Sequence, residues 1–286
     1  MAASSMKDIK LRIKSVEGTR QITKAMELVA SSKLRRAKER AESTRPYFTT
    51  LHQGLYDIAH ADTGVDFTSP YIEQREVKKS CYVMIAGDRG LAGGYNTNLF
   101  KAVQEHMGDK NLCVLPIGKK AVEYCVHHDM EILTDEYMSV EAISLGTCFA
   151  VARTLCEQFL AGAFDELYVG YTNFVSMLSQ QPAVLKILPI HHEEEQAKTT
   201  GVKSLMLYEP SGAEVYNAIV PEYVGGLLWG AVAESLASEL GARRTAMDAA
   251  SKNAGEMIDD LSLKYNRARQ GAITQEITEI VAGAEA

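Results

Sequence analysis

A glycine-rich segment, GDRGLAGGYN at residues 87–96, is the first place in this chain where chemistry could occur. It follows a predicted strand and precedes a predicted helix, and backbone N–H groups at such a turn can bind phosphate. The dinucleotide fingerprint needs GxGxxG and the P-loop needs GxxxxGK[ST], however, and the glycines at 87, 90, 93 and 94 fit neither pattern. A structural turn and a nucleotide site remain as alternatives, and the spacing favours the turn.

Histidines, carboxylates and thiols offer few candidates for a metal ligand or a nucleophile. His191, His192 and Glu193–Glu195 are adjacent on a polar loop, and neighbours rarely converge on one ion without a distant ligand. His127 and His128 end a predicted helix, where the helix dipole favours imidazolium. The cysteines contain no CxxC pair and lie mostly in apolar segments, which predicts reduced, buried thiols. We therefore expect no catalytic, cofactor-binding or metal site. The cysteines are at positions 81, 113, 125, 148 and 156.

The elements that would position any site differ between the middle and the ends of the chain. Over residues 77–208, short apolar runs alternate with amphipathic stretches, which is typical of a compact, Rossmann-like α/β domain with a largely parallel sheet. The short segment between the last two long strands favours an antiparallel hairpin. The predicted strands are 81–86, 112–118, 166–174, 183–190 and a short one at 204–208, and the predicted helices are 97–107, 119–128 and 141–162.

Both ends of the chain carry apolar residues at alternating steps of four and three, over residues 9–58 and 229–268. This 3.5-residue period predicts that the N- and C-terminal helices form an antiparallel coiled coil. The N-terminal seam is Ile9, Ile13, Val16, Arg20, Thr23, Glu27, Ala30, Leu34, Ala37, Ala41, Thr44, Phe48, Leu51, Leu55 and Ile58. The C-terminal seam is Trp229, Ala233, Leu236, Leu240, Arg243, Met247, Ala250, Ala254, Met257, Leu261, Lys264 and Ala268.

Prolines and glycines bound these helices. The first should run from near Ser5 to about residue 60, with Pro46 at a kink, a break or a junction between two helices. After Pro221 about 60 residues can form a helix roughly 90 Å long, which exceeds the width of a compact chain of this size, so we expect it to protrude. Glycines at 225, 226, 230, 241, 255 and 271 weaken this helix but allow another backbone to approach closely.

Irregularities in the C-terminal helix point to a partner. Arg243 and Lys264 occupy predicted seam positions, where a cation must either extend to solvent or meet a carboxylate from an enclosing partner. Near the end of the chain, four aliphatic residues have no second helix long enough to cover them all, which suggests a socket in another protein. They are Ile273, Ile277, Ile280 and Val281.

Charge is divided unevenly along the 286 residues. Residues 1–45 hold 12 Lys and Arg against 5 Asp and Glu, while the rest hold 18 against 32. The basic run from Lys33 to Arg40 could be a solvated helix face, a site for an acidic protein or a nucleic-acid site. With no apolar run near 18 residues and no signal peptide, we expect an intracellular protein. The predicted organisation is a coiled-coil helix over 1–60, a linker over 61–76, the α/β domain over 77–208 and a second coiled-coil helix over 209–286.

Three segments together resemble the gamma subunits of bacterial F-type ATP synthases, over essentially the whole chain. They are IKLRIKSVEGTRQITKAMELVASSKLRRA at 9–37, DRGLAGGYN at 88–96 and SLKYNRARQGAITQEITEIVAGA at 262–284. The sequence differs from the usual family pattern at Ala92, where cysteine is frequent, and at Arg244, where methionine is usual.

The resemblance implies a central rotor shaft with no catalytic chemistry and no cofactor of its own. Such a subunit couples ion-driven rotation of the c-ring to ATP synthesis or hydrolysis at the beta subunits through asymmetric contacts. The implied partners are the alpha and beta subunits, epsilon and the c-ring, with one copy per complex and no nucleic acid. The implied location is peripheral, on the cytoplasmic face of the bacterial cell membrane. The family's contact residues for the alpha and beta ring correspond here to Met26, Arg243, Gln270, Thr274, Glu276, Thr278 and Glu279.

Overall fold

The computed structural model of the chain describes residues 2–60, 67–108, 111–134, 136–191 and 208–284. Its contacts divide the chain into two compact units, one formed by Met1–Ser32 with Arg243–Ala286 and the other by Lys33–Ala242. Helix α1 (Ala2–Ala59) and helix α5 (Gly212–Ala284) contribute residues to both units. The domain boundaries predicted at residues 60, 76 and 208 rest on the sequence pattern, and this division by contacts does not test them. They stay predictions.

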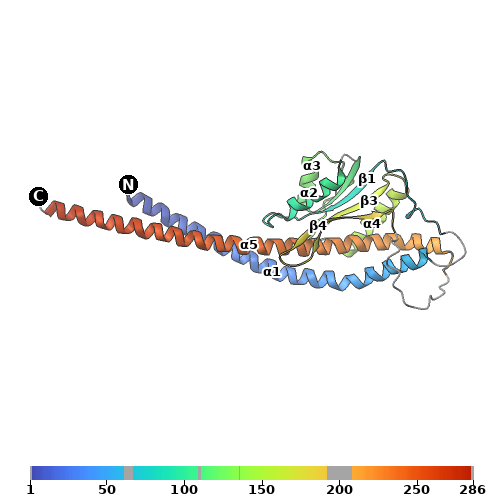
Figure 1. Cartoon of the computed structure of the whole chain (residues 1–286), viewed down its shortest axis with the longest axis horizontal. Coiled ribbons are helices and arrows are strands. Elements are labelled where there is room, and N and C mark those ends of the chain that lie inside the picture. The colour runs from blue at the N-terminus through green and yellow to red at the C-terminus, as the bar shows by residue number, and fades with distance from the viewer. Residues whose placement is uncertain (1, 61–66, 109–110, 135, 192–207, 285–286) are drawn as a thin grey trace. The chain divides into compact units, whose positions relative to one another are not determined.

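A four-stranded sheet forms the centre of the second unit (Figure 1). Strands β1 (Ser80–Ile85), β2 (Leu112–Ile117), β3 (Glu166–Phe174) and β4 (Gln180–Leu188) lie in the order β2-β1-β3-β4. Strand β1 is parallel to both β2 and β3, whereas β3 and β4 are antiparallel. The four long predicted strands and the hairpin are confirmed, with strand starts displaced by up to three residues. The short strand predicted at 204–208 falls almost wholly outside the described residues.

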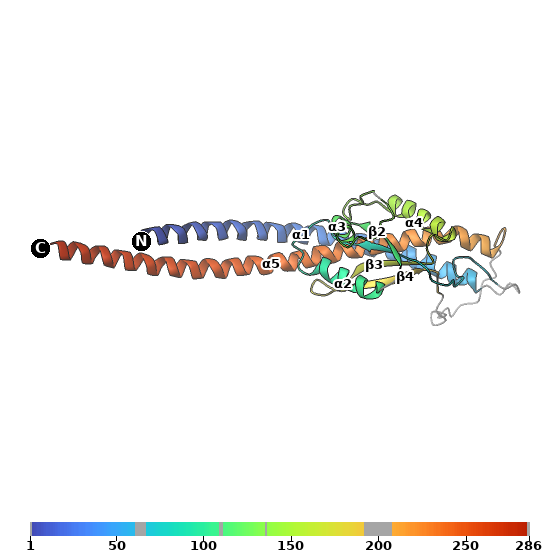
Figure 2. The same ribbon diagram turned by 90° about the horizontal axis from the view of Figure 1, so that it is seen from above.

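Helices cover both faces of this sheet, as Figure 2 shows from above. Helices α2 (Tyr95–Met107) and α3 (Lys119–His127) pack on the face that carries Tyr82 and Met84 of β1. Helix α4 (Leu145–Leu160) packs on the opposite face. Because β1 is covered on both sides, its residues form a continuous apolar run instead of an alternating one. The predicted helices are confirmed, with ends displaced by up to four residues.

Segments of α1 and α5 join α4 on that second face. Leu55 and Ile58 of α1 pack in the same core as Tyr216, Val220 and Val224 of α5. Helix α1 is one helix that Pro46 does not divide, which confirms the predicted helix to about residue 60 and excludes a break or a junction at the proline. A proline removes one backbone hydrogen bond, and packing on both sides maintains the remaining helix.

Helix α5 begins nine residues before Pro221 and not after it, which corrects the predicted start. Ser211 accepts a hydrogen bond from the backbone N–H of Glu214 at 3.2 Å, and the two residues match the Ser-x-x-Glu capping pattern. This cap specifies the helix start, and Pro221 lies inside the helix. The sequence contained the signal in SGAE at 211–214.

The paired glycines of α5 make room for aromatic rings, and at Gly225 also for the backbone of α4, because an added β-carbon would lie 3.1 Å from Cα of Phe149. A β-carbon at Gly225 would overlap the ring of Phe149 from α4, and one at Gly226 would overlap the ring of Phe48 from α1. Both helices therefore press side chains into the same short stretch of α5. Close packing of α1, α4 and α5 depends on these two positions having no side chain.

Candidate partner-binding surface

The glycine-rich turn after β1 is held by side chains of its own unit. The carboxylate of Asp88 accepts hydrogen bonds from the hydroxyls of Tyr137 and Ser139, both at 2.7 Å, and from the backbone N–H of Lys119 at 3.1 Å. Burial alone would raise the pKa of Asp88, but the hydrogen bonds from Ser139 and Tyr137 outweigh it and the pKa is lowered. Asp88 thus ties this turn to the segment after β2.

A buried acid stands beside the same turn. The N–H of Gly87 donates to Oδ1 of Asn96 at 2.9 Å, so one N–H of the turn is already satisfied. Glu239 of α5 is 3 % exposed, and a β-carbon at Gly87 would lie 2.8 Å from its Oε1. A carboxylate fixed this close to the turn disfavours a bound phosphate. The geometry favours the structural turn over the nucleotide site.

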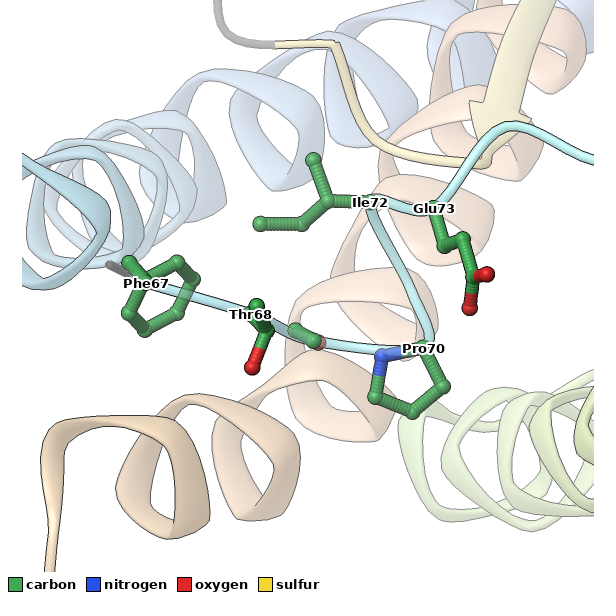
Figure 3. Close-up of a pocket in the computed structure, with 6 residues that line it drawn as sticks. Phe67, Thr68, Pro70, Ile72 and Glu73 are labelled. Atoms are coloured by element: carbon green, nitrogen blue, oxygen red, sulfur yellow. The ribbon is translucent and has the colours of Figure 1, made fainter.

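A cavity of about 580 Å³ opens in the second unit, and Figure 3 shows its lining. The hydroxyl of Ser69 donates to Oδ1 of Asn217 at 2.7 Å and accepts from the N–H of Tyr71 at 3.2 Å, so it serves the fold. Glu73 is the one charged side chain among the described lining residues. We assign this cavity no ligand. The lining consists of Phe67, Thr68, Ser69, Pro70, Ile72 and Glu73.

The basic run of α1 makes contacts inside its own unit. The ammonium of Lys33 lies 2.9 Å from a carboxylate oxygen of Glu141, and the guanidinium of Arg40 lies 3.8 Å from the ring centre of Trp229. Two further cations of the run pair with glutamates one helical turn away. These interactions favour an anchored, partly solvated helix face over a nucleic-acid site.

All five cysteines are buried and free, which confirms the prediction of reduced, buried thiols. Among the residues that the structure describes, no cluster of three or more His, Cys, Asp and Glu side chains is suited to a metal ion. His191 is described and its ring approaches the side-chain amide of Gln74. His192 and Glu193–Glu195 lie outside the described residues.

The first unit is an antiparallel pair of helices formed by the start of α1 and the end of α5 (Figures 1 and 2). The seam predicted for α1 is confirmed at Thr23, Glu27 and Ala30, which are buried. Arg20 is exposed, yet its backbone oxygen accepts a hydrogen bond from the hydroxyl of Ser251 on α5 at 3.4 Å. The predicted helix pair is thus present in this unit.

At every second position of the α5 seam, the residue that packs in the seam is the one that follows the predicted residue. Met247 and Ala254 are buried as expected, but Met257 is exposed, and Ile258 is the more buried neighbour. Lys264 is also exposed and pairs with Asp260 at 2.7 Å, so its predicted place in the seam is wrong. From Met247 the observed seam steps by four residues to Ser251, where the prediction stepped by three to Ala250, because the apolar Ala250 and Met257 favoured the predicted phase. The observed seam is Met247, Ser251, Ala254, Ile258, Leu261, Tyr265 and Ala268.

All seven contact residues implied by the family resemblance lie in this first unit. Arg243 is only 8 % exposed and Met26 is half-buried, whereas the five residues further along α5 are exposed. The hydroxyls of Thr274 and Thr278 donate to backbone oxygens one turn earlier. Spacing by four residues places Gln270, Thr274 and Thr278 along one side of the helix. The other two exposed residues are Glu276 and Glu279.

Exposed aliphatic side chains accompany these polar residues. The uncovered tip predicted near the end of α5 is confirmed, because Ile273, Ile277, Ile280 and Val281 are each at least 46 % exposed. A second group on α1 was missed, although its members stand out as apolar residues off the seam steps. An exposed aliphatic surface of this extent is typical of a protein-binding site. The second group is Leu11, Ile22, Leu28 and Val29, each at least 56 % exposed.

Within the described ranges, no helix combines the length and the apolar character that crossing a membrane requires.

Comparisons with known proteins agree with this description. The family model described as ATP synthase matches residues 5–286. The ATP synthase gamma chain of Ruminococcus albus is 47 % identical over 285 residues, covering 97 % of this chain and 96 % of the relative. The sodium ion specific ATP synthase gamma chain of Acetobacterium woodii is 43 % identical and covers 99 % of both.

Solved structures show the same fold at low sequence identity. A chain of the Euglena gracilis mitochondrial ATP synthase, in a structure of its OSCP, F1 and c-ring, matches with a TM-score of 0.66 at 20 % identity, over 99 % of this chain and 94 % of that one. A chain from the central stalk and c-ring of the Tetrahymena thermophila enzyme matches with a TM-score of 0.61 at 21 % identity, over 80 % and 99 %. From the family model and the full-length relatives, the chain belongs to the ATP synthase family, among its gamma chains.

Proposed function

We propose that this chain is the central rotor shaft of a bacterial F-type ATP synthase. It couples ion-driven rotation of a c-ring to ATP synthesis or hydrolysis at the beta subunits. The observation that carries this proposal is similarity over nearly the full length to proteins named ATP synthase gamma chain, at up to 47 % identity. The exposed aliphatic tip of α5 supports it, because a shaft needs a surface for a surrounding partner.

The mechanism follows from unequal surfaces around the helix pair of the first unit. A rotor can shift the nucleotide state of a beta subunit only if it interacts differently with the different states. Exposed aliphatic residues such as Ile22 on α1 and Ile277 on α5 alternate with charged residues such as Glu276, so one partner meets different chemistry at different rotor angles. Asymmetric contact thereby links rotation to catalysis in another subunit. In this proposal the chain itself is non-catalytic.

The residues proposed to contact the alpha and beta ring are those implied by the family resemblance. The exposed carboxylates Glu276 and Glu279 would meet cations or N–H donors, since charge complementarity specifies the partner. Met26 is half-buried and would contribute an apolar contact. Arg243 has little accessible surface, so we expect it to contribute least to direct binding. The full set is Met26, Arg243, Gln270, Thr274, Glu276, Thr278 and Glu279.

The proposed assembly contains one copy of this chain, the alpha and beta subunits, epsilon and the c-ring, and no nucleic acid. It places the chain peripherally, on the cytoplasmic face of the cell membrane. Similarity to chains from an F1 and c-ring assembly and from a central stalk and c-ring supports a place in such an assembly, and the individual subunits are part of the proposal.

Reconstitution tests the proposal. Purified alpha and beta subunits from the same source are mixed with and without this chain, and assembly and ATP hydrolysis are measured. We expect stable, ATPase-active assembly only when the chain is present, and ion pumping only after epsilon and the membrane sector are added. Equal assembly and activity without the chain would contradict the rotor proposal. A matched protein of unrelated sequence, added at the same concentration, controls for non-specific stabilisation.

A further inference from the structure

Strand β3 extends beyond its parallel neighbour. The pairing of β1 with β3 ends at Met84 and Gly170, while β3 continues to Phe174. Thr172 therefore lies past the end of β1, with its antiparallel partner Pro182 on the opposite side. Buried backbone N–H and C=O groups need hydrogen-bond partners, and Thr172 is only 2 % exposed.

Helix α5 supplies these partners with two serine side chains. The N–H of Thr172 donates to Oγ of Ser235 at 3.2 Å, and Oγ of Ser238 donates to the carbonyl oxygen of Thr172 at 3.0 Å. Both serines are fully buried. The two hydroxyls occupy the place that a continuing β1 strand would fill, so α5 completes the edge of the sheet at this residue.

Apolar packing holds much of α5 near this contact, because aromatic rings fill the places at Gly225 and Gly226 and because Leu228 and Val232 are buried. Apolar burial is not directional, so the two serine hydroxyls add contacts that depend on one rotational position of the helix. A shift of α5 by one residue turns its surface by about 100° and would break both hydrogen bonds to Thr172. Directional polar contacts inside an apolar interface can specify one arrangement among several.

We propose that Ser235 and Ser238 are positioning residues, which fix the axial and rotational position of α5 against the sheet. This inference rests on the proposed rotor function, and it adds a role within it. Torque applied to the α/β domain turns α5 without slippage only if the two move as one body. The two serines hold the sheet and the helix in one register, and the apolar core holds them together.

Distance measurements test the positioning directly. Spin labels are attached to cysteines introduced at Val126 on α3 and Ala218 on α5, which are both exposed, whereas the native cysteines are buried. In the full chain we expect one narrow distance distribution, which becomes broad or displaced in Ser235→Ala/Ser238→Ala. An unchanged distribution in the double variant would overturn the proposal.

Hydrogen exchange tests the two hydrogen bonds one at a time, and it also shows whether a variant has unfolded. Ser235→Ala should speed exchange of the Thr172 amide about tenfold, because it removes that amide's acceptor. Ser238→Ala removes only the donor to the carbonyl and should change that amide's exchange much less. Equal effects of the two variants on this amide, with exchange elsewhere unchanged, would contradict the assigned bonds.

Pumping by the reconstituted complex tests the consequence for torque. Without an ion gradient, we expect the double variant to hydrolyse ATP within about twofold of the unaltered complex. Against a full gradient, ions pumped per ATP should fall severalfold. The matched control is Ser251→Ala, which removes a buried hydroxyl from α5 at a place that contacts α1 rather than the sheet. A purely stabilising role for Ser235 and Ser238 would lower the yield of complex and leave the gradient dependence unchanged, which would also overturn the proposal.

The outcomes separate this inference from the function on which it rests. If the unaltered chain fails to support assembly and pumping, the rotor proposal fails. If the unaltered chain supports pumping and the double variant matches it under every gradient, only the positioning role of the two serines fails.

Discussion

Replacing Gly226 by alanine should destabilise the second unit, although alanine is the better helix former. A β-carbon at this position would overlap Cε1 and Cδ1 of the Phe48 ring and lie 3.0 Å from Cζ. Relief requires the ring to move, and the ring centre of Tyr47 lies 5.1 Å from that of Phe48. Overpacking of this kind typically costs about 1–3 kcal/mol.

The higher helix propensity of alanine opposes this cost, and its size is known well enough to predict the sign of the net change in stability. Alanine in place of glycine inside a helix contributes about 1 kcal/mol. Because two ring carbons overlap the new atom, we take the upper part of the overpacking range and expect a net loss of about 1–2 kcal/mol in the free energy of unfolding. For a chain of this size the loss lowers Tm by about 3–6 °C.

Gly230→Ala provides the control on the same helix, four residues away. Among the described residues, and apart from the adjacent residues and the helix's own backbone, no atom lies within 4 Å of a β-carbon built there, so the helix-forming gain should dominate and stability should rise by up to about 1 kcal/mol. Unfolding is followed by circular dichroism and by fluorescence of Trp229, the single tryptophan. Adding Phe48→Leu to Gly226→Ala should recover part of the loss. If Gly226→Ala and Gly230→Ala change stability in the same direction, the packing argument is wrong.

Three further predictions concern the proposed contact surface and the buried thiols. Met26→Lys should lower the number of ions pumped per ATP at least twofold while hydrolysis continues, because a new cation binds some states of the beta subunit more tightly than others. The control is Met257→Lys, which alters an exposed methionine of the same unit. Equal effects of the two variants would count against Met26 as a contact. Removing residues 275–286 deletes most of the aliphatic tip and should slow ATP hydrolysis by the assembled complex severalfold without stopping rotation; complete loss of rotation would mean that the tip is essential. Burial raises the pKa of Cys148 and Cys156 to about 12, so these two thiols should resist a disulfide reagent at pH 8 in the folded chain. Their contribution to stability should be lost as pH rises from about 9, where unfolded thiols ionise, towards 12. Rapid labelling of the folded chain at pH 8 would refute the burial.

The sequence allowed the architecture to be predicted because hydrophobic periodicity reports burial. Strand β3 was predicted with its observed ends, since it contains the apolar run at 167–171 and only a short segment separates it from the next apolar run. The start of α5 was misplaced because Pro221 was given more weight than the Ser211 cap. Local capping determined where the helix begins, and packing against α1 and α4 maintained it through the proline.

The interaction surface was less accessible from sequence alone. The aliphatic tip of α5 could be predicted, because the sequence contains no second helix long enough to cover all of its residues. The phase of the α5 seam could not, since Ala250 and Met257 together are at least as apolar as Ser251 and Ile258, which occupy the seam. The bonds from Ser235 and Ser238 to Thr172 join residues about 65 positions apart, and no spacing rule relates serines on a helix to the end of a strand.

The uncovered isoleucines of α5 have a consequence for the cell that makes this protein. A copy that has not joined a complex displays several large aliphatic side chains to water, including Ile277 and Ile280. Such surfaces are what chaperones and proteases bind on incompletely assembled proteins, and they promote aggregation. Surplus copies should therefore be short-lived, and the amount of this chain should follow the supply of its partners rather than its own rate of synthesis.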